Sequence, residues 1–153
     1  YAAGLSLKEE NLDAFTQRFL KLAADEIIPE QMTPQIDIDA VLDLQDINSK
    51  FMSELKKMNP FGPDNQKPVF CSLGVKDYGT SKLVGKDLEH IKLELIDDKS
   101  NTPIHGIAFG MHQHNTHIKN MKPFNICYTI EENTYNGNTS LQLMVKDIKE
   151  NDI

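Results

Sequence analysis

The part of the chain from Pro68 onward consists of short runs of β-branched and aromatic residues, separated by turn residues at short intervals. Runs of this length and composition are typical of β-strands. Asn136 and Gly137 form a strong hairpin signal. We expect five strands, at residues 69–75, 90–96, 104–111, 124–131 and 141–148. The first is expected to continue through residues 82–84 after a turn. The larger part of the chain is therefore predicted to be a small β-domain.

Two helices are expected before these strands. The first begins at Ser6, whose spacing to Glu9 fits a capping box, and ends near Ile27. Its apolar residues recur at helical spacing, which predicts one buried face formed by Leu12, Phe15, Phe19 and Leu22. A half-exposed strand is expected at 35–42. The second helix is expected at 46–58, with a buried stripe formed by Ile47, Phe51, Leu55 and Met58.

Three strands, a polar segment at 112–121 and a hairpin follow one another in the chain order of an OB-type barrel. We expect the polar segment to be a loop or a short helix. The predicted fold class is therefore α+β and mainly β: a five-stranded OB-type barrel preceded by two helices. Pro29 and Pro34 bracket a connecting segment, which separates residues 1–33 from the barrel domain, residues 34–150, with its leading strand and helix.

The net charge of −7 is unfavourable for binding an anion, but the charge is spread unevenly. Residues 1–69 hold 7 basic and 12 acidic side chains, whereas residues 70–125 hold 7 basic and 6 acidic ones and all five histidines. An anionic ligand would meet the least repulsion there. Because secretory signals and membrane-length apolar runs are absent, and the two cysteines form no CxxC pair, we expect a cytoplasmic protein with reduced thiols and no membrane partner.

Catalytic motifs are absent from the sequence: it contains no GxSxG, no phosphate-binding glycine-rich loop and no HExxH. His112, His114 and His117 lie within six residues and could hold a transition metal. A zinc site would still need a fourth ligand, and the neighbouring residues offer none. We therefore expect a polar loop of water-facing histidines, with no catalytic residue, no metal ligand and no cofactor in this chain.

The strands at 90–96 and 104–111 correspond to the second and third strands of an OB barrel, which carry its oligonucleotide-facing surface. Residues suited to contact a single strand gather in this region. Lysines and a histidine can approach phosphates, and Tyr78 and Phe109 can stack on bases, although Phe109 fits the core equally well. The predicted contact residues are Lys76, Tyr78, Lys86, His90, Lys92 and Phe109.

Several segments resemble one known family. Tyr1-Ala2-Ala3-Gly4, followed by an amphipathic helix, resembles the end of the GGHxxAAG motif of DHH-superfamily phosphoesterases. The segment ELKKMNPFGPDNQKPVF (residues 54–70) resembles the helix-PFGxGNPxPVF junction of RecJ exonucleases, with Asp64 in place of the family's second glycine. VGKDLEHIKLEL (84–95) and GIAFG (106–110) resemble the next two strands of that family's OB domain.

The resemblance implies the C-terminal part of a single-strand-specific 5′→3′ DNA exonuclease of repair and recombination. Its Mn²⁺ or Mg²⁺ ions would be held by aspartates and histidines of an upstream DHH domain, which is absent here. Residues 1–33 would be the tail of the DHH-associated domain. The implied partners are single-stranded DNA, the DHH catalytic domain of the same chain and single-strand-binding protein. The resemblance also implies that Ala3, Gly4, Phe61 and Asn65 contact nucleic acid, in addition to the six residues named above.

Two other functions stay open at the level of sequence. The net charge of −7 and the single arginine, Arg18, favour a protein-interaction or structural module that docks on the nuclease core with little DNA contact. The three-histidine segment leaves open a regulatory metal site.

Overall fold

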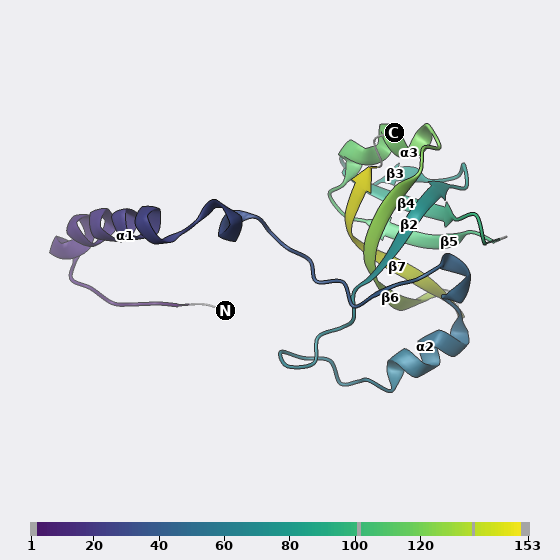
Figure 1. Cartoon of the computed structure of the whole chain (residues 1–153), viewed down its shortest axis with the longest axis horizontal. Helices are drawn as coiled ribbons and strands as arrows, with labels where there is room; N and C mark the ends of the chain where they lie inside the picture. The colour runs from purple at the N-terminus through teal and green to yellow at the C-terminus, as the bar shows by residue number, and fades with distance from the viewer. Residues whose placement is uncertain (1–2, 101, 136, 151–153) are drawn as a thin grey trace. The chain divides into compact units, whose positions relative to one another are not determined.

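The computed structural model describes residues 3–100, 102–135 and 137–150. The chain divides into two compact units, unit 1 (residues 1–36) and unit 2 (residues 37–153). Figure 1 shows the course of the chain through both. Within the described residues, no helix is long and apolar enough to cross a membrane.

Unit 1 contains one α-helix, α1 (Leu12–Glu26), preceded by a 3-10 turn at Glu9–Asn11 and followed by another at Pro29–Met32. The predicted start at Ser6 was wrong, because helical structure begins only at Glu9. The predicted buried face was also wrong. No residue of α1 is buried, and Phe19 is 58% exposed. Helical spacing of apolar residues creates an apolar face, but burial needs a surface that packs against it.

Unit 2 begins with β1 (Ala40–Val41), which pairs in parallel with β2 (Phe70–Asp77). The strand predicted at 35–42 is therefore only two residues long. A 3-10 turn (Leu44–Asp46) leads into α2 (Ser49–Lys56). Asn48 caps this helix, because its Oδ1 accepts hydrogen bonds from the amides of Lys50 and Phe51 at 3.1 and 3.0 Å. The predicted stripe is buried at Ile47 and Leu55, partly buried at Phe51, and exposed at Met58.

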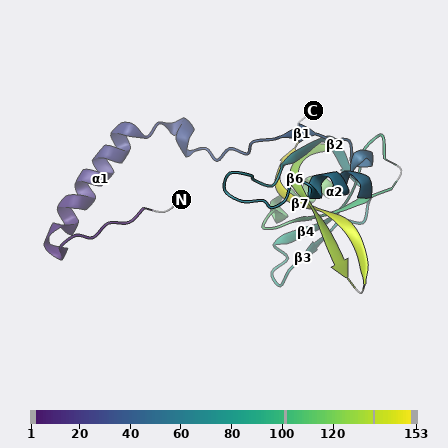
Figure 2. The same cartoon turned by 90° about the horizontal axis from the view of Figure 1, so that it is seen from below.

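The remaining strands of unit 2 are β3 (Lys82–Val84), β4 (His90–Ile96), β5 (Ile104–Ala108), β6 (Phe124–Tyr135) and β7 (Asn138–Glu150). The sheet order is β1-β2-β6-β7-β5-β4-β3, and β2 also pairs with β4. The pairings of β2, β6, β7, β5 and β4 therefore form a closed circuit (Figures 1 and 2). β5 and β7 run parallel, and the other pairs of the circuit are antiparallel.

All five predicted strands are present. The short strand β1 lies within the strand predicted at 35–42, and β3 corresponds to the expected continuation of the first strand through residues 82–84. β6 and β7 are longer than predicted and form the hairpin that projects from unit 2 in Figure 2. Gly137 has a φ of 80° in its turn, whereas Asn136 lies outside the described residues. The polar segment between β5 and β6 is a 3-10 turn (His112–His114) and a short helix, α3 (Asn115–Lys119), as one of its two alternatives predicted.

The core of unit 2 is formed by alternate residues of the strands, together with side chains of α2 and α3. Ile91, Leu93 and Leu95 of β4 are fully buried. Tyr128 is also fully buried, and its hydroxyl lies 2.7 Å from the Ser72 hydroxyl. Burial raises the pKa of Tyr128 to about 12, because an ionised phenol would lose its hydration.

Asp97 ties the segment before α2 to the turn after β4. Its carboxylate accepts hydrogen bonds from the amides of Leu44, at 2.7 Å, and Lys99, at 3.0 Å. Burial of the carboxyl acts to raise its pKa, but these hydrogen bonds outweigh burial and lower it. The turn after β4 is thereby anchored to the segment that precedes α2.

Candidate nucleic-acid interface

Outward-facing and buried side chains alternate along β4. His90, Lys92 and Glu94 face outward, whereas the residues between them, Ile91 and Leu93, belong to the core. Lys92 is paired in register with Lys82 of β3 on one side and with Ile107 of β5 on the other. Two lysines therefore lie side by side on the exposed face, although like charges that face each other across two strands destabilise a sheet. We call this outward row along β4, together with Lys82 beside it and Phe109 at its end, the β4 strip.

At one end of the β4 strip, His90 and Phe109 form an aromatic pair. Their ring centroids are 4.9 Å apart with an edge-to-face angle of 80°. Phe109 is 55% exposed, so it belongs to the surface and not to the core. Its open ring area can stack on a nucleobase, which needs no particular sequence because every base has a π-face.

A hydrogen bond and a close carboxylate contact orient the His90 ring. The amide of Gly110 donates to Nδ1 of His90 at 3.0 Å. Nδ1 is therefore the acceptor nitrogen, which leaves the ring hydrogen on Nε2, 3.2 Å from Oε1 of Glu89. The ring is held from both sides, so Phe109 packs against a rigid neighbour.

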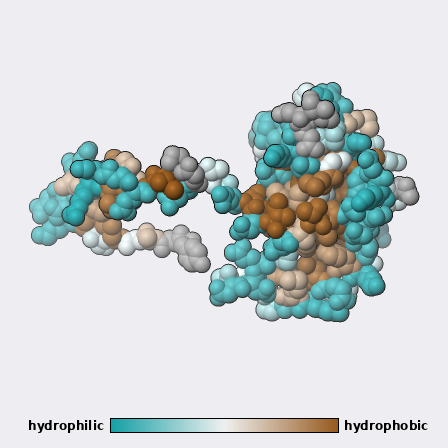
Figure 3. Space-filling view, in the orientation of Figure 1, coloured by the Kyte–Doolittle hydropathy of each residue, from teal (hydrophilic) through white to brown (hydrophobic). Residues whose placement is uncertain are grey.

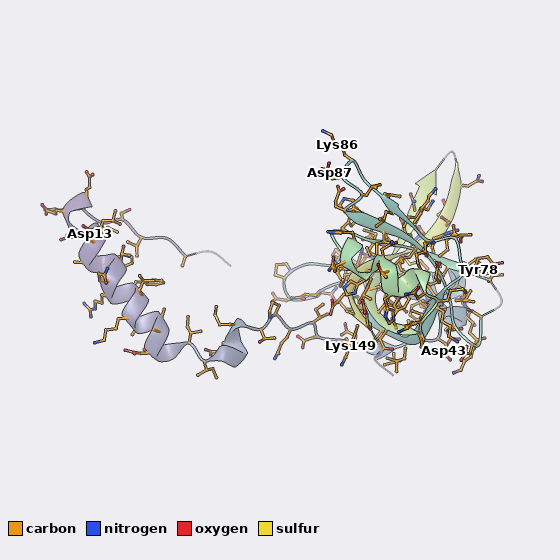
Figure 4. All side chains as sticks on the ribbon, turned by 90° about the horizontal axis from the view of Figure 1, so that it is seen from above. Asp13, Asp43, Tyr78, Lys86, Asp87 and Lys149 are labelled. Atoms are coloured by element: carbon orange, nitrogen blue, oxygen red, sulfur yellow. The ribbon has the colours of Figure 1, made fainter. Side chains whose placement is uncertain are left out.

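The turn between β3 and β4 carries Lys86 beyond this aromatic pair. Gly85 has a φ of 98°, and an added Cβ would lie 2.6 Å from Oε2 of Glu89. The Glu89 carboxylate covers Gly85 and accepts a hydrogen bond from the Asp87 amide at 3.0 Å. Hydrogen bonding of Glu89, first with its own backbone and then with Asp87, lowers its pKa. Lys86 and Asp87 project together at the tip of this turn (Figure 4).

The opposite end of the β4 strip is more acidic. Glu94 accepts a hydrogen bond from the Thr80 hydroxyl, and its Oε1 lies 3.6 Å from Nδ1 of His105. Tyr78, 51% exposed, is tied to this end because its amide donates to the Glu94 carbonyl at 2.8 Å. In Figure 4 it lies on the other side of unit 2 from Lys86. A single-stranded nucleic acid lying along β4 would therefore contact lysines at one end and a carboxylate at the other.

Lys76 also belongs to this end, because its position on β2 is paired with Ile96 of β4. Its ammonium group lies 3.2 Å from Oδ1 of Asp98. Asp98 is almost fully exposed, with 88% of its side chain accessible, so solvent screens this ion pair strongly. Lys76 can exchange its partner for a phosphate at little cost.

The structure brings six of the ten predicted contact residues to the β4 strip and its two ends: Lys76, Tyr78, Lys86, His90, Lys92 and Phe109. Lys82 belongs to the same cluster of lysines in the sequence but was not among the predicted contact residues, because its place beside Lys92 depends on the register of β3 against β4. The signal was the run of residues 82–84 after the turn at Gly79.

Phe61 and Asn65 lie elsewhere, in the loop after α2. The Asn65 amide donates to the carbonyls of Met58, at 2.8 Å, and Pro60, at 3.0 Å, so it holds the loop in shape. Phe61 lines a groove of about 330 Å³ together with Met52, Leu55, Lys56, Asn59, Lys67, Ile130, Glu131 and Glu132. Ala3 and Gly4 are exposed residues of unit 1.

Two of the three histidines of the polar segment, His114 and His117, face Glu150 with side chains only 19% and 9% exposed, so the expectation of water-facing histidines was wrong for both. His114 Nδ1 lies 2.8 Å from Oε1 of Glu150, and His117 Nδ1 lies 3.1 Å from its Oε2. His117 Nε2 lies 3.2 Å from the carbonyl of Pro123. Among the residues that the structure describes, no group of three or more His, Cys, Asp or Glu side chains could hold a metal ion.

Comparison with known proteins identifies the family. The family model of the RecJ OB domain matches residues 38–147, most of the chain and nearly all of unit 2. The chain belongs to the RecJ OB domain family. This confirms the resemblance found in the sequence, and it confirms a mostly-β OB domain accompanied by a few helices.

Relatives of known name agree with this family. The chain is 27% identical to the single-stranded-DNA-specific exonuclease RecJ of Haemophilus influenzae over 148 residues, 97% of this chain and 25% of that protein. It is 26% identical to the RecJ of Bacillus subtilis over 147 residues, 95% of this chain and 18% of that protein. The chain thus spans a quarter or less of the length of these curated relatives.

A solved structure supports the fold. The crystal structure of RecJ from Thermus thermophilus in complex with Mn²⁺ superposes with a TM-score of 0.74 over 98% of this chain and 21% of that one, at 17% identity. The complex of the same protein with Mg²⁺ gives a TM-score of 0.72. At this identity, the match speaks for the fold alone.

Proposed function

We propose that this chain is the single-stranded DNA-binding C-terminal region of a RecJ-like 5′→3′ exonuclease acting in DNA repair and recombination. In this proposal, the closed circuit of unit 2 is a five-stranded OB-type barrel that guides the strand toward a catalytic DHH domain elsewhere in the protein. The single observation that carries it is the β4 strip, which combines the exposed Phe109 with the adjacent Lys82 and Lys92, on or beside the strands that OB domains use for oligonucleotides.

The β4 strip supplies the two components that sequence-tolerant binding of a single strand requires. Phe109, supported by His90, offers a stacking surface. Lys82 and Lys92 offer a pair of positive charges beside it, which phosphates would neutralise with release of counterions. The net charge of −7 and Glu94 oppose binding, so we expect weak affinity with strong salt dependence.

Phosphodiester hydrolysis is proposed for the parent enzyme and not for this chain. Crystal structures of the RecJ of Thermus thermophilus are complexes with Mn²⁺ and with Mg²⁺. In the parent enzyme, such ions would supply a Lewis acid and lower the pKa of a bound water. The described part of this chain has no cluster that fits such an ion, so we assign it no hydrolytic step. Two free thiols suit a reducing compartment such as the cytoplasm.

A titration of labelled oligothymidine against the chain at low salt tests this function. We expect Lys82→Glu and Lys92→Glu each to weaken binding and to reduce the slope of log K against log salt by about one. Phe109→Ala should cost about 1–3 kcal/mol of binding free energy through lost stacking. Lys57→Glu, a charge reversal on the surface next to α2, is the matched control. Equal loss in all variants would remove the β4 strip from the binding site.

Unit 1 favours a second function, docking on another part of the parent protein. Its helix α1 exposes Leu12, Phe15, Phe19 and Leu22, and the rings of Phe15 and Phe19 stack at 5.8 Å. We propose that residues 1–33 are the tail of the DHH-associated domain and that this face packs on the upstream part of the same protein. An isolated helix this short would be marginal in water without such packing.

A binding assay between this chain and the separately produced upstream domains tests docking. Phe19→Asp should abolish binding, and the exposed polar Gln17→Asp should leave it intact. Tight docking together with no measurable DNA affinity at low salt would favour the interaction module over the DNA-binding region. Single-strand-binding protein, added in the same assay, tests the third proposed partner.

A further inference from the structure

Cys71 of β2 and Cys127 of β6 lie directly opposite each other in an antiparallel ladder. Residues opposite each other in such a ladder project to the same face of the sheet. The neighbouring pair, Phe70 and Tyr128, belongs to the core, so the cysteines project outward. They are 7% and 8% exposed, and both are free thiols. Figure 3 shows that apolar side chains cover much of the visible face of unit 2.

The backbone at this pair permits a bond between the two sulfurs. Opposite residues of an antiparallel ladder have Cα atoms about 4.5–5.5 Å apart. A disulfide accepts Cα separations of about 4.4–6.8 Å, with Cβ atoms about 3.5–4.5 Å apart. The register of the β2–β6 pairing shifts between Ser72 and Val75, and the register of the β6–β7 pairing shifts between Cys127 and Tyr128. Such bulges increase the local twist of the strands that carry the two cysteines.

The two thiols are expected to react slowly with external disulfides. Burial raises the pKa of Cys71, and burial, Asp147 and the nearby Cys71 together raise the pKa of Cys127. Only thiolates attack disulfides, so both side chains react slowly at neutral pH. Once one cysteine has reacted, however, the other is already in place for the second step.

We propose that Cys71 and Cys127 are a redox-sensitive dithiol that closes into a reversible cross-strand disulfide when a small-molecule disulfide such as oxidised glutathione is present. One cysteine thiolate attacks the external disulfide, forming a mixed disulfide and releasing one thiolate. The second cysteine thiolate attacks the protein sulfur of that mixed disulfide and releases the other external thiolate. The pair loses two electrons and two protons, and the external disulfide becomes two thiols.

The bond would join β2 to β6 and close a loop that contains β3, β4, β5 and α3. The strands of the closed circuit would stay tethered when the chain unfolds. The dithiol shares no residue with the β4 strip, so this proposal is independent of the proposed DNA-binding function.

The test incubates the whole chain with oxidised glutathione at pH 8.5, with and without denaturing urea, and then blocks remaining thiols with N-ethylmaleimide. In the native chain, we expect intact mass to show loss of two hydrogen atoms and peptide mapping to show Cys71 linked to Cys127. The ratio of internal to mixed disulfide should be at least about tenfold higher in the native chain than in urea, because folding holds the second thiol close. Added dithiothreitol should restore both thiols.

Cys71→Ser and Cys127→Ser are the matched controls, and each should yield only the mixed disulfide at the remaining cysteine. The oxidised wild type should also unfold at a higher urea concentration than the reduced one, which neither single variant should do. Mixed disulfides only, disulfide-linked dimers only, or equal ratios in native and urea-treated chains would each overturn the proposal.

Discussion

The helix α1 of unit 1 and the strand β4 of unit 2 both carry apolar residues at the spacing their secondary structure demands, yet their environments are opposite. Leu22 of α1 is 52% exposed, whereas Leu93 of β4 is completely buried. α1 has no buried residue at all, but β4 lies between β3, β5 and β2 and contributes three fully buried side chains. Periodicity therefore predicts which face is apolar, and the presence of a second surface decides whether that face is buried.

Leucine-to-alanine substitutions give the largest expected effect. Leu93→Ala should reduce the free energy of unfolding by about 2–5 kcal/mol, because it removes buried methyl groups and leaves a cavity. Leu22→Ala should change it by no more than about 0.5 kcal/mol, since its side chain is already in water. Urea titrations followed by circular dichroism measure both. Comparable costs would show that α1 has a packing partner within this chain.

The turn that carries Lys86 gives the next effect. Gly85→Ala combines a positive φ with a Cβ 2.6 Å from the Glu89 carboxylate, so it should cost about 1–3 kcal/mol. Gly79→Ala has a similar φ of 107° but open space around the added Cβ, and it isolates the backbone cost. Thermal unfolding compares the two variants. A Gly85→Ala cost no larger than that of Gly79→Ala would mean that Glu89 moves aside freely.

The two helix starts provide a smaller contrast. Asn48→Ala should destabilise unit 2 by about 1 kcal/mol, because it removes the acceptor of two amide hydrogen bonds at the start of α2. Asn11→Ala should have almost no effect, since Asn11 makes no side-chain capping bond to α1. Urea midpoints of the two variants decide this prediction, and equal losses would contradict it.

Loss of the Asp97 charge in acid should produce the smallest effect. The pKa of Asp97 is lower in the folded chain than its usual 3.8, so ionisation of this carboxyl favours the folded state. Its contribution to the free energy of unfolding is complete above the pKa of the unfolded chain and is lost as the pH falls through the lower pKa of the folded chain. Urea titrations from pH 6 to pH 2.5 should show a weaker pH dependence for Asp97→Asn than for the wild type. Identical profiles would remove Asp97 from the acid response.

Part of the candidate interface could be predicted from the sequence. Strict alternation in residues 90–96 placed His90 and Lys92 on the outward face, as the structure shows. Phe109 stayed ambiguous because residues 104–111 lack clean alternation, and only the end of β5 at Ala108 put its ring on the surface.

Other residues needed the three-dimensional structure because their roles depend on distant parts of the chain. Lys82 became the neighbour of Lys92 through strand register, and Asp97 became an anchor for Leu44 through a hydrogen bond across the fold. Asn65, which the family motif suggested as a binding residue, uses its amide to hold its own loop. Local pattern contains no information on which partner a polar side chain reaches.

The sequence by itself determined the type and order of the strands, the hairpin at the end and the family, because these depend on period-two alternation, turn residues and short motifs. The tertiary structure alone decided the register in which the strands pair, that α1 stays exposed, and that two cysteines distant in sequence lie opposite each other. Closure and register are set by contacts between residues far apart in the chain, whose energies appear only when the strands meet.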